Sequence, residues 1–68
     1  MTTEKMAEPL KEGTIVKILH SGIHRAEIVE YRGELGPKGA RIYRVLAVKK
    51  PRLYMEVRED QLEVLSEL

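Results

Sequence analysis

Apolar and polar residues alternate along much of this chain, and the alternation predicts β-strands. It is most regular over residues 53–58, where residues expected to face a core alternate with residues expected to face solvent. Residues 14–20, 25–31 and 41–48 are rich in β-branched and aromatic side chains, which also favours strands. The pattern therefore predicts an all-β chain.

The alternation also predicts which face of a strand is buried. In residues 53–58 we expect Leu53, Met55 and Val57 to face inward and Tyr54 to face outward. In residues 25–31 the two faces carry different sets: Ala26 and Ile28 on one, and Arg25, Glu27, Val29 and Tyr31 on the other. Residues 14–20 and 41–48 have apolar side chains on both faces, so their inner faces stay open.

Residues 25–48 form the centre of this arrangement. Two predicted strands flank residues 32–40, which contain three glycines and Pro37. Such a composition predicts a β-hairpin with a long, irregular tip. We expect Leu35, the one large apolar residue of the tip, to fold back onto the sheet.

The C-terminal part predicts a single helical turn followed by a short strand. Residues 59–62 are polar and few, which fits one 3₁₀ turn with Asp60 as a possible cap and Leu62 buried. Residues 63–65 then supply the last strand. The alternative is a longer helix from Glu59, with Leu62, Leu65 and Leu68 along one side.

Residues 1–10 show no sustained period and include Pro9, so we expect a flexible N-terminal arm. Residues 11–68 would then form one domain. A chain of 68 residues without cysteine has no disulfide and no cysteine-ligated zinc, and its two histidines have no evident metal-binding partners. We expect no cofactor and no metal. No apolar run could span a bilayer and no export signal is evident, which favours a cytoplasmic protein.

Gly13, Val16, Ile18 and Gly22, followed by residues 25–29, resemble the opening of KOW and Tudor-type domains. The ending EVREDQLEVL resembles the close of the same families, in which a helical turn leads into the fifth strand. The resemblance covers roughly residues 12–66. It implies a small five-stranded SH3-like (Src-homology-3) barrel with a short 3₁₀ turn before the last strand, acting as a binding module.

The middle of the chain is basic and its end is acidic. Residues 11–55 carry ten lysines and arginines against four glutamates, and residues 56–68 carry five acids against one arginine. Cations of the middle segment could bind the phosphates of RNA or DNA. The candidate nucleic-acid-binding residues are Lys38, Arg41, Lys49, Lys50 and Arg52, with Arg25 and Arg44 in the same basic set. Alternatively, these side chains are solvated and discourage edge-to-edge sheet pairing.

A protein partner is the first expectation, with nucleic acid as the alternative and no membrane association. The candidate protein-binding residues are Tyr31, Arg44 and Tyr54, because tyrosine and arginine carry much of the energy of protein interfaces. The acids of residues 56–60 could stabilise the helical turn or contact a basic partner, such as a second copy of the chain. The oligomeric state stays open.

Two further patterns were weighed as catalytic sites. Ser21 lies between His20 and His24, but no carboxylate is placed to orient either imidazole. Lys38 lies in the sequence GPKG, which lacks the spacing of a phosphate-binding loop. We therefore expect a non-catalytic binding module that docks onto a partner protein or a larger complex.

Overall fold

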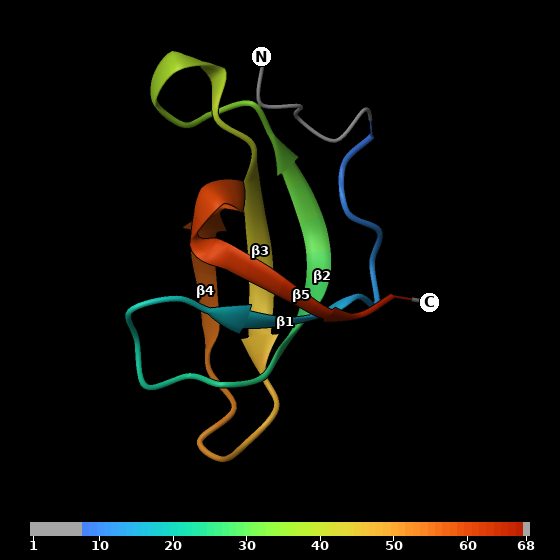
Figure 1. Cartoon of the computed structure of the whole chain (residues 1–68), viewed down its shortest axis with the longest axis vertical. Coiled ribbons are helices and arrows are strands. Elements are labelled where there is room, and N and C mark those ends of the chain that lie inside the picture. The colour runs from blue at the N-terminus through green and yellow to red at the C-terminus, as the bar shows by residue number, and fades with distance from the viewer. Residues whose placement is uncertain (1–7, 68) are drawn as a thin grey trace.

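The computed structural model describes residues 8–67 of the chain. Five strands and two 3₁₀ turns account for its regular structure (Figure 1). In chain order they are β1 (Ile15–Ile18), β2 (Ala26–Gly33), η1 (Pro37–Gly39), β3 (Ile42–Ala47), β4 (Tyr54–Arg58), η2 (Glu59–Gln61) and β5 (Leu62–Ser66). The all-β class, the five strands and the 3₁₀ turn before the last strand are confirmed, whereas the alternative of a C-terminal helix from Glu59 is wrong.

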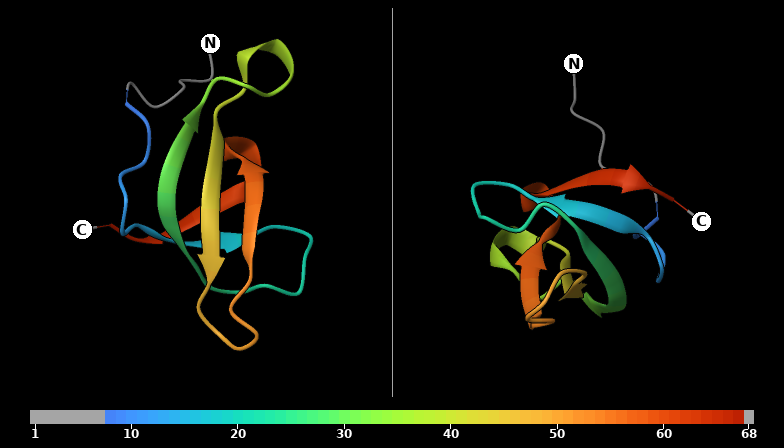
Figure 2. Two further views of the ribbon diagram at one scale, coloured as in Figure 1. Left: turned by 180° about the vertical axis from the view of Figure 1, so that it is seen from behind. Right: turned by 90° about the horizontal axis from the view of Figure 1, so that it is seen from below.

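All strands belong to one antiparallel sheet in the order β4-β3-β2-β1-β5. Strands β2, β3 and β4 form an upright meander, and β1 and β5 cross it at a steep angle (Figures 1 and 2). The sheet therefore bends over on itself. Within residues 8–67, β4 and β5 lie at opposite ends of the strand order with no ladder between them, so the sheet is not closed into a barrel.

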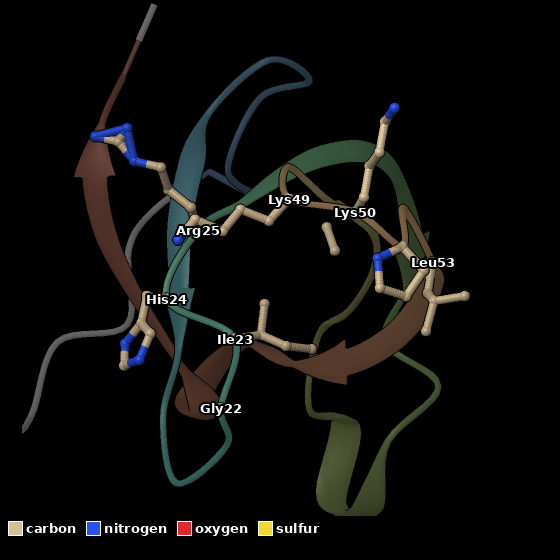
Figure 3. A pocket seen from close by; sticks show the side chains of 9 residues that line it. Gly22, Ile23, His24, Arg25, Lys49, Lys50 and Leu53 are labelled. Atoms are coloured by element: carbon tan, nitrogen blue, oxygen red, sulfur yellow. The ribbon is translucent and has the colours of Figure 1, made fainter.

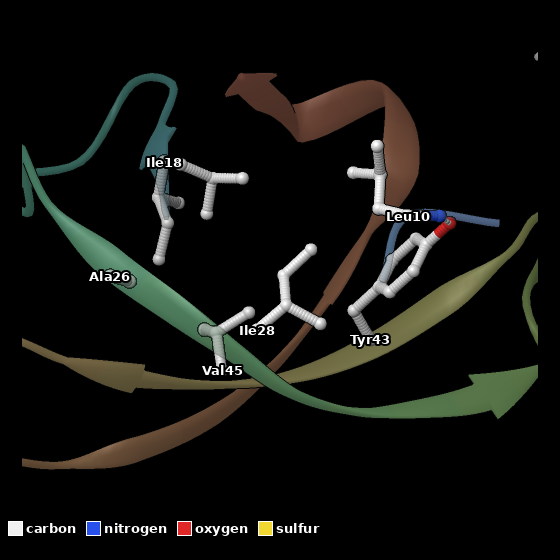
Figure 4. Close-up of a cluster of buried hydrophobic side chains, with 7 residues drawn as sticks. Leu10, Ile18, Ala26, Ile28, Tyr43 and Val45 are labelled. Atoms are coloured by element: carbon white, nitrogen blue, oxygen red, sulfur yellow. Dashed lines mark hydrogen bonds between the residues drawn. The ribbon is translucent and has the colours of Figure 1, made fainter. Parts of the chain in front are cut away.

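The core lies between the meander and the crossing strands (Figure 4). Val16 and Ile18 of β1 face Ala26 and Ile28 of β2, and β3 contributes Tyr43 and Val45. The inner face of β1 therefore carries Val16 and Ile18, and the inner face of β3 carries Tyr43 and Val45; the sequence pattern had left both faces open. Leu10 also belongs to the core. Residues 1–7 of the predicted arm lie outside the described residues, but its last residue packs against the sheet.

A bulge in β2 changes the face to which Tyr31 belongs. Ile28 pairs with Val45, but the next pair is Glu30 with Arg44, so Val29 has no direct partner. One extra residue in a strand moves every later side chain to the opposite face. Tyr31 accordingly pairs with Tyr43 on the inner face. The prediction that Tyr31 shares a face with Glu27 and Val29 is wrong.

Three other side-chain predictions are wrong. Leu53 precedes β4 and is 56% exposed, although Met55 and Val57 do pack against the core as expected. Leu35 does not fold back onto the sheet and is 72% exposed. Asp60 makes no side-chain cap for η2; its carboxylate instead accepts a hydrogen bond from Arg58 Nε at 3.1 Å.

Candidate binding site

Arg41, a candidate nucleic-acid-binding residue, is buried in the structure. Only 8% of it is exposed, and its Nη1 lies 3.4 Å from Glu59 Oε1. The backbone reinforces this contact, because the Glu59 N–H donates to the Arg41 carbonyl at 2.8 Å. A guanidinium held in this way anchors η2 to the start of β3. It is not available for a phosphate.

The carboxylate of Glu59 also accepts a hydrogen bond from Tyr43. The two oxygens are 2.5 Å apart, and the same hydroxyl accepts the Leu10 N–H at 2.9 Å. Burial, together with the bond to Glu59, raises the pKa of Tyr43 to about 12. Desolvation alone would lower the pKa of Arg41, but the attraction and hydrogen bond of Glu59 outweigh it and raise that pKa above its ordinary value. Tyr43 is thus a core residue that ties Leu10 to η2.

Lys38, a second candidate for nucleic-acid binding, lies in η1 with a left-handed backbone of φ 57°. That turn is at the opposite end of the molecule from the β3–β4 connection, which carries Lys49, Lys50 and Arg52 (Figure 1). The molecule is 39 Å long along this axis. The five candidate residues therefore do not form one surface.

The candidate protein-binding residues are also divided. Tyr31 packs against the core, with its ring centroid 5.3 Å from that of Tyr43. Arg44 and Tyr54 do meet on the outer face of the meander, where the guanidinium carbon of Arg44 lies 4.5 Å from the ring centroid of Tyr54. The structure brings together two of the three residues and directs Tyr31 inward.

The outer face of the meander is electrically balanced around this pair. Arg32 lies 3.1 Å from Glu30 and 3.3 Å from Glu56, measured between its guanidinium nitrogens and their carboxylate oxygens. Arg44 stands opposite both glutamates in the sheet register. Each cation of this face thus has a carboxylate or a ring beside it, so the face offers little unpaired charge to a ligand.

A cleft opens at the lower end of the meander, between the β1–β2 loop and the β3–β4 turn (Figure 3). Its volume is about 530 Å³. That size lies within the range of ~300–1,000 Å³ of ligand pockets in proteins. We call it the basic cleft; its lining residues are Gly22, Ile23, His24, Arg25, Ala47, Lys49, Lys50, Pro51 and Leu53.

The lining of the basic cleft combines cations with apolar surface. Arg25, Lys49 and Lys50 supply three positive charges, and no lining residue is acidic. Within residues 8–67, none of these three cations takes part in an ion pair. Apolar surface comes from Ile23, Ala47, Pro51 and the exposed Leu53. Charge and apolar area are therefore both presented to solvent at one place.

Hydrogen bonds hold the β1–β2 wall of the basic cleft in shape. The Ser21 hydroxyl donates to the Ile18 carbonyl at 2.8 Å and accepts the Ile23 N–H at 3.1 Å. The Ile18 N–H donates to the Ile23 carbonyl at 3.2 Å, and the Ile23 side chain packs against the core. The left-handed residue of this loop is His20, at φ 59°. Ser21 thus shapes the loop.

Backbone hydrogen bonds connect the β3–β4 wall internally and also join it to the β1–β2 wall. The Ala47 N–H donates to the Leu53 carbonyl at 2.9 Å, which closes the turn. The Val48 N–H donates to the Arg25 carbonyl at 3.1 Å, which joins the two walls at their base. Arg52 Nε reaches the Ala47 carbonyl at 3.5 Å. The cleft is consequently preformed.

Of the sequence-predicted site residues, only Lys49 and Lys50 line the basic cleft. Arg25, noted as part of the basic set, joins them. Sequence reasoning missed Ile23, Pro51 and Leu53 as site residues. The available signal was an apolar residue close to each basic segment: Ile23 lies two residues before Arg25, and Leu53 directly follows Arg52.

Comparison of the chain with protein-family models, with curated proteins and with solved structures found no match. Within the part of the chain that the structure describes, no group of three or more histidine or carboxylate side chains could hold a metal ion. The same residues include no helix with the length and apolarity needed to cross a membrane. The case for function therefore depends on the geometry of the cleft.

Proposed function

We propose that this protein is a small non-catalytic binding module that docks onto a partner protein through the basic cleft. One observation carries the proposal: exposed apolar side chains, Leu53 above all, line the same cleft as three cations for which the described residues provide no ion-pair partner. Exposed apolar surface bordered by polar residues marks interaction sites in soluble proteins. A preformed site also binds at a smaller entropic cost.

The non-catalytic part of the proposal is supported by the chemistry of the lining. A general acid or base must be positioned against a reacting group, and a nucleophile needs a neighbouring base. The cleft presents the imidazole of His24 and the cations of its rim, but no carboxylate and no hydroxyl among its nine lining residues. The Ser21 hydroxyl is engaged by two backbone groups.

We also propose kinship with the SH3-like barrels, and within them with KOW and Tudor-type domains. Support comes from the five strands, the long β2–β3 hairpin and the η2 turn before β5, which follow the arrangement that the sequence resemblance implies. The cytoplasmic location expected from the sequence stays a prediction.

Nucleic-acid binding is the second candidate function. It is favoured by Arg25, Lys49 and Lys50, three unpaired cations in one cleft. Two observations weigh against it: the lining contains no tyrosine on which a base could stack, and of the three other candidate cations Arg41 is buried and Lys38 lies at the far end, which leaves Arg52 alone in the β3–β4 turn beside the cleft. Protein docking is therefore preferred.

Photo-crosslinking in the native cell tests the proposal. A photo-reactive amino acid replaces Leu53, and a matched variant carries it at Leu35, which is also exposed but lies in the β2–β3 loop beyond β2. We expect an adduct from position 53 that protease removes and nuclease does not, with none from position 35. A nuclease-sensitive adduct would replace the proposal with the second candidate, and equal adducts at both positions would refute it.

A further inference from the structure

We propose that the basic cleft binds an extended acidic peptide segment in which one apolar side chain is flanked by carboxylates. The apolar side chain would lie against Ile23, Pro51 and Leu53, and the carboxylates would face Arg25, Lys49 and Lys50. This inference rests on the proposed function and names the chemistry of the partner segment.

The apolar lining residues Ile23, Pro51 and Leu53 indicate that the ligand carries an apolar side chain. Leu53 is large, apolar and 56% exposed, although it stands next to a strand whose inner residues reach the core. The Ile23 side chain packs against the core, and the Ile23 N–H donates a hydrogen bond to the Ser21 hydroxyl. Covering this rigid apolar surface with a leucine-sized side chain removes it from water without reordering the walls.

The three cations of the cleft, Arg25, Lys49 and Lys50, indicate that the ligand also carries carboxylates. Arg25 comes from one wall, and Lys49 and Lys50 come from the other, so cations border the cleft on both walls; the charged ends of Arg25 and Lys50 point outward from it (Figure 3). Across an interface, complementary charges select the partner and speed its association. A peptide with acids on both sides of its apolar residue can meet both walls at once.

A peptide fits these features better than a nucleic acid does. Single-stranded nucleic acid needs a basic track along its backbone and aromatic rings beneath its bases. Beyond the cleft, Arg41 is buried against Glu59, and Arg44 and Arg32 are engaged on the outer face. Lys38 lies at the opposite end of the molecule, so the cations of the cleft do not continue into one long basic track, and the aliphatic lining of the cleft suits a short acidic and apolar segment.

Fluorescence anisotropy with synthetic peptides tests the inference. The probe is a labelled short peptide with one leucine between pairs of glutamates. One comparison peptide replaces the leucine by serine, another replaces the glutamates by glutamines, and a labelled single-stranded RNA is titrated separately. We expect the probe to bind with a dissociation constant below about 1 mM and to weaken about tenfold or more as salt is raised from ~20 to ~200 mM. Both comparison peptides should bind about tenfold more weakly.

Matched variants locate the site. Leu53→Ala and the double variant Lys49→Ala/Lys50→Ala should each weaken the probe about tenfold. Leu35→Ala and Lys38→Ala remove similar side chains at the other end of the molecule and should leave its affinity unchanged. Because all five positions are exposed, each variant is expected to fold, and thermal unfolding followed by circular dichroism checks this.

The outcomes separate this inference from the proposed function. Absence of probe binding, or equal binding of either comparison peptide, overturns the inference, while a protein adduct at position 53 still supports protein docking. RNA binding without peptide binding overturns both. Probe binding that Leu53→Ala leaves intact but Leu35→Ala removes would place the site at the other end of the molecule and refute the inference.

Discussion

At the upper end of the β2–β3–β4 meander Arg41 is buried against Glu59, whereas at the lower end Lys49 and Lys50 extend from the β3–β4 wall of the basic cleft. All three belong to the same basic stretch of the sequence. Arg41 has a carboxylate within 3.4 Å, a tyrosine bonded to that carboxylate and a backbone link to η2. The two lysines have exposed apolar neighbours instead. The first end serves stability, and the second is proposed to serve binding.

The difference teaches that charge becomes a binding feature only where the fold leaves it without a partner. A buried guanidinium that lost its carboxylate would destabilise the domain, so its role is fixed by folding. An exposed lysine costs the fold little when it is removed. Substitutions at the two ends should therefore affect different measurements, and the following predictions use that contrast, beginning with the largest effect.

Arg41→Met should give the largest loss of stability. It removes the cation that faces the Glu59 carboxylate and leaves that carboxylate uncompensated beside the core. We expect the equilibrium constant for unfolding to rise by more than ~100-fold in urea titrations. Lys49→Met is the charge-matched control at the other end and should change that constant less than ~3-fold. Equal effects of the two substitutions would remove the contrast between the ends.

Tyr43→Phe should lower the free energy of unfolding by about 1–2 kcal/mol, because it removes the hydrogen bonds with Glu59 and Leu10 from a buried site. The native protein should also lose stability relative to this variant in alkali. An unfolded tyrosine ionises near pH 10, but Tyr43 in the fold ionises at about 12, so its contribution is complete below pH 10 and is lost as the pH rises towards 12. Urea titrations of both proteins at pH 9 and above measure this, and parallel curves would contradict it.

The Arg44–Tyr54 contact should contribute a smaller amount. The guanidinium lies over a ring that is itself exposed, so we expect a coupling of about 0.5 kcal/mol. A double-mutant cycle with Arg44→Ala and Tyr54→Leu measures it through urea unfolding. Peptide binding should not change in either single variant. A loss of binding would move the site from the cleft to the outer face.

Arg32→Ala should have the smallest effect, at about 0.3 kcal/mol or less. Its ion pairs with Glu30 and Glu56 are about half exposed and are screened by salt. We expect the difference from the native protein to vanish at ~1 M salt. A difference that persists at high salt would show that Arg32 supports the meander through packing.

Much of the fold could be predicted because strand alternation is a local property. The period of two placed the strands within a few residues of their observed ends, and the polar interval after Arg58 predicted η2. The face of Tyr31 could not be predicted, because one unpaired residue, Val29, reverses the alternation, and no residue type in β2 marks the bulge. The open sheet was not predicted either. Whether β4 and β5 pair to close a barrel depends on contacts between distant parts of the chain, which strand alternation does not report.

The candidate site was harder to predict for the same reason. Lys49 and Lys50 stood out as charges, but their partners in the cleft come from a loop more than twenty residues earlier in the chain. Only the folded backbone, through the bond from Val48 to Arg25, brings the two walls together. Conversely, Arg41 looked like its basic neighbours because nothing in the sequence pairs it with Glu59, eighteen residues later.

The most direct test of the account is an NMR titration of the isotopically labelled protein with the leucine-and-glutamate peptide. The account predicts that amide shifts concentrate at Ile23, Arg25, Lys49 and Leu53, and that the amides of Arg44, Tyr54 and Lys38 stay in place. Shifts centred on the outer face of the meander or on η1, with the cleft amides unmoved, would contradict it.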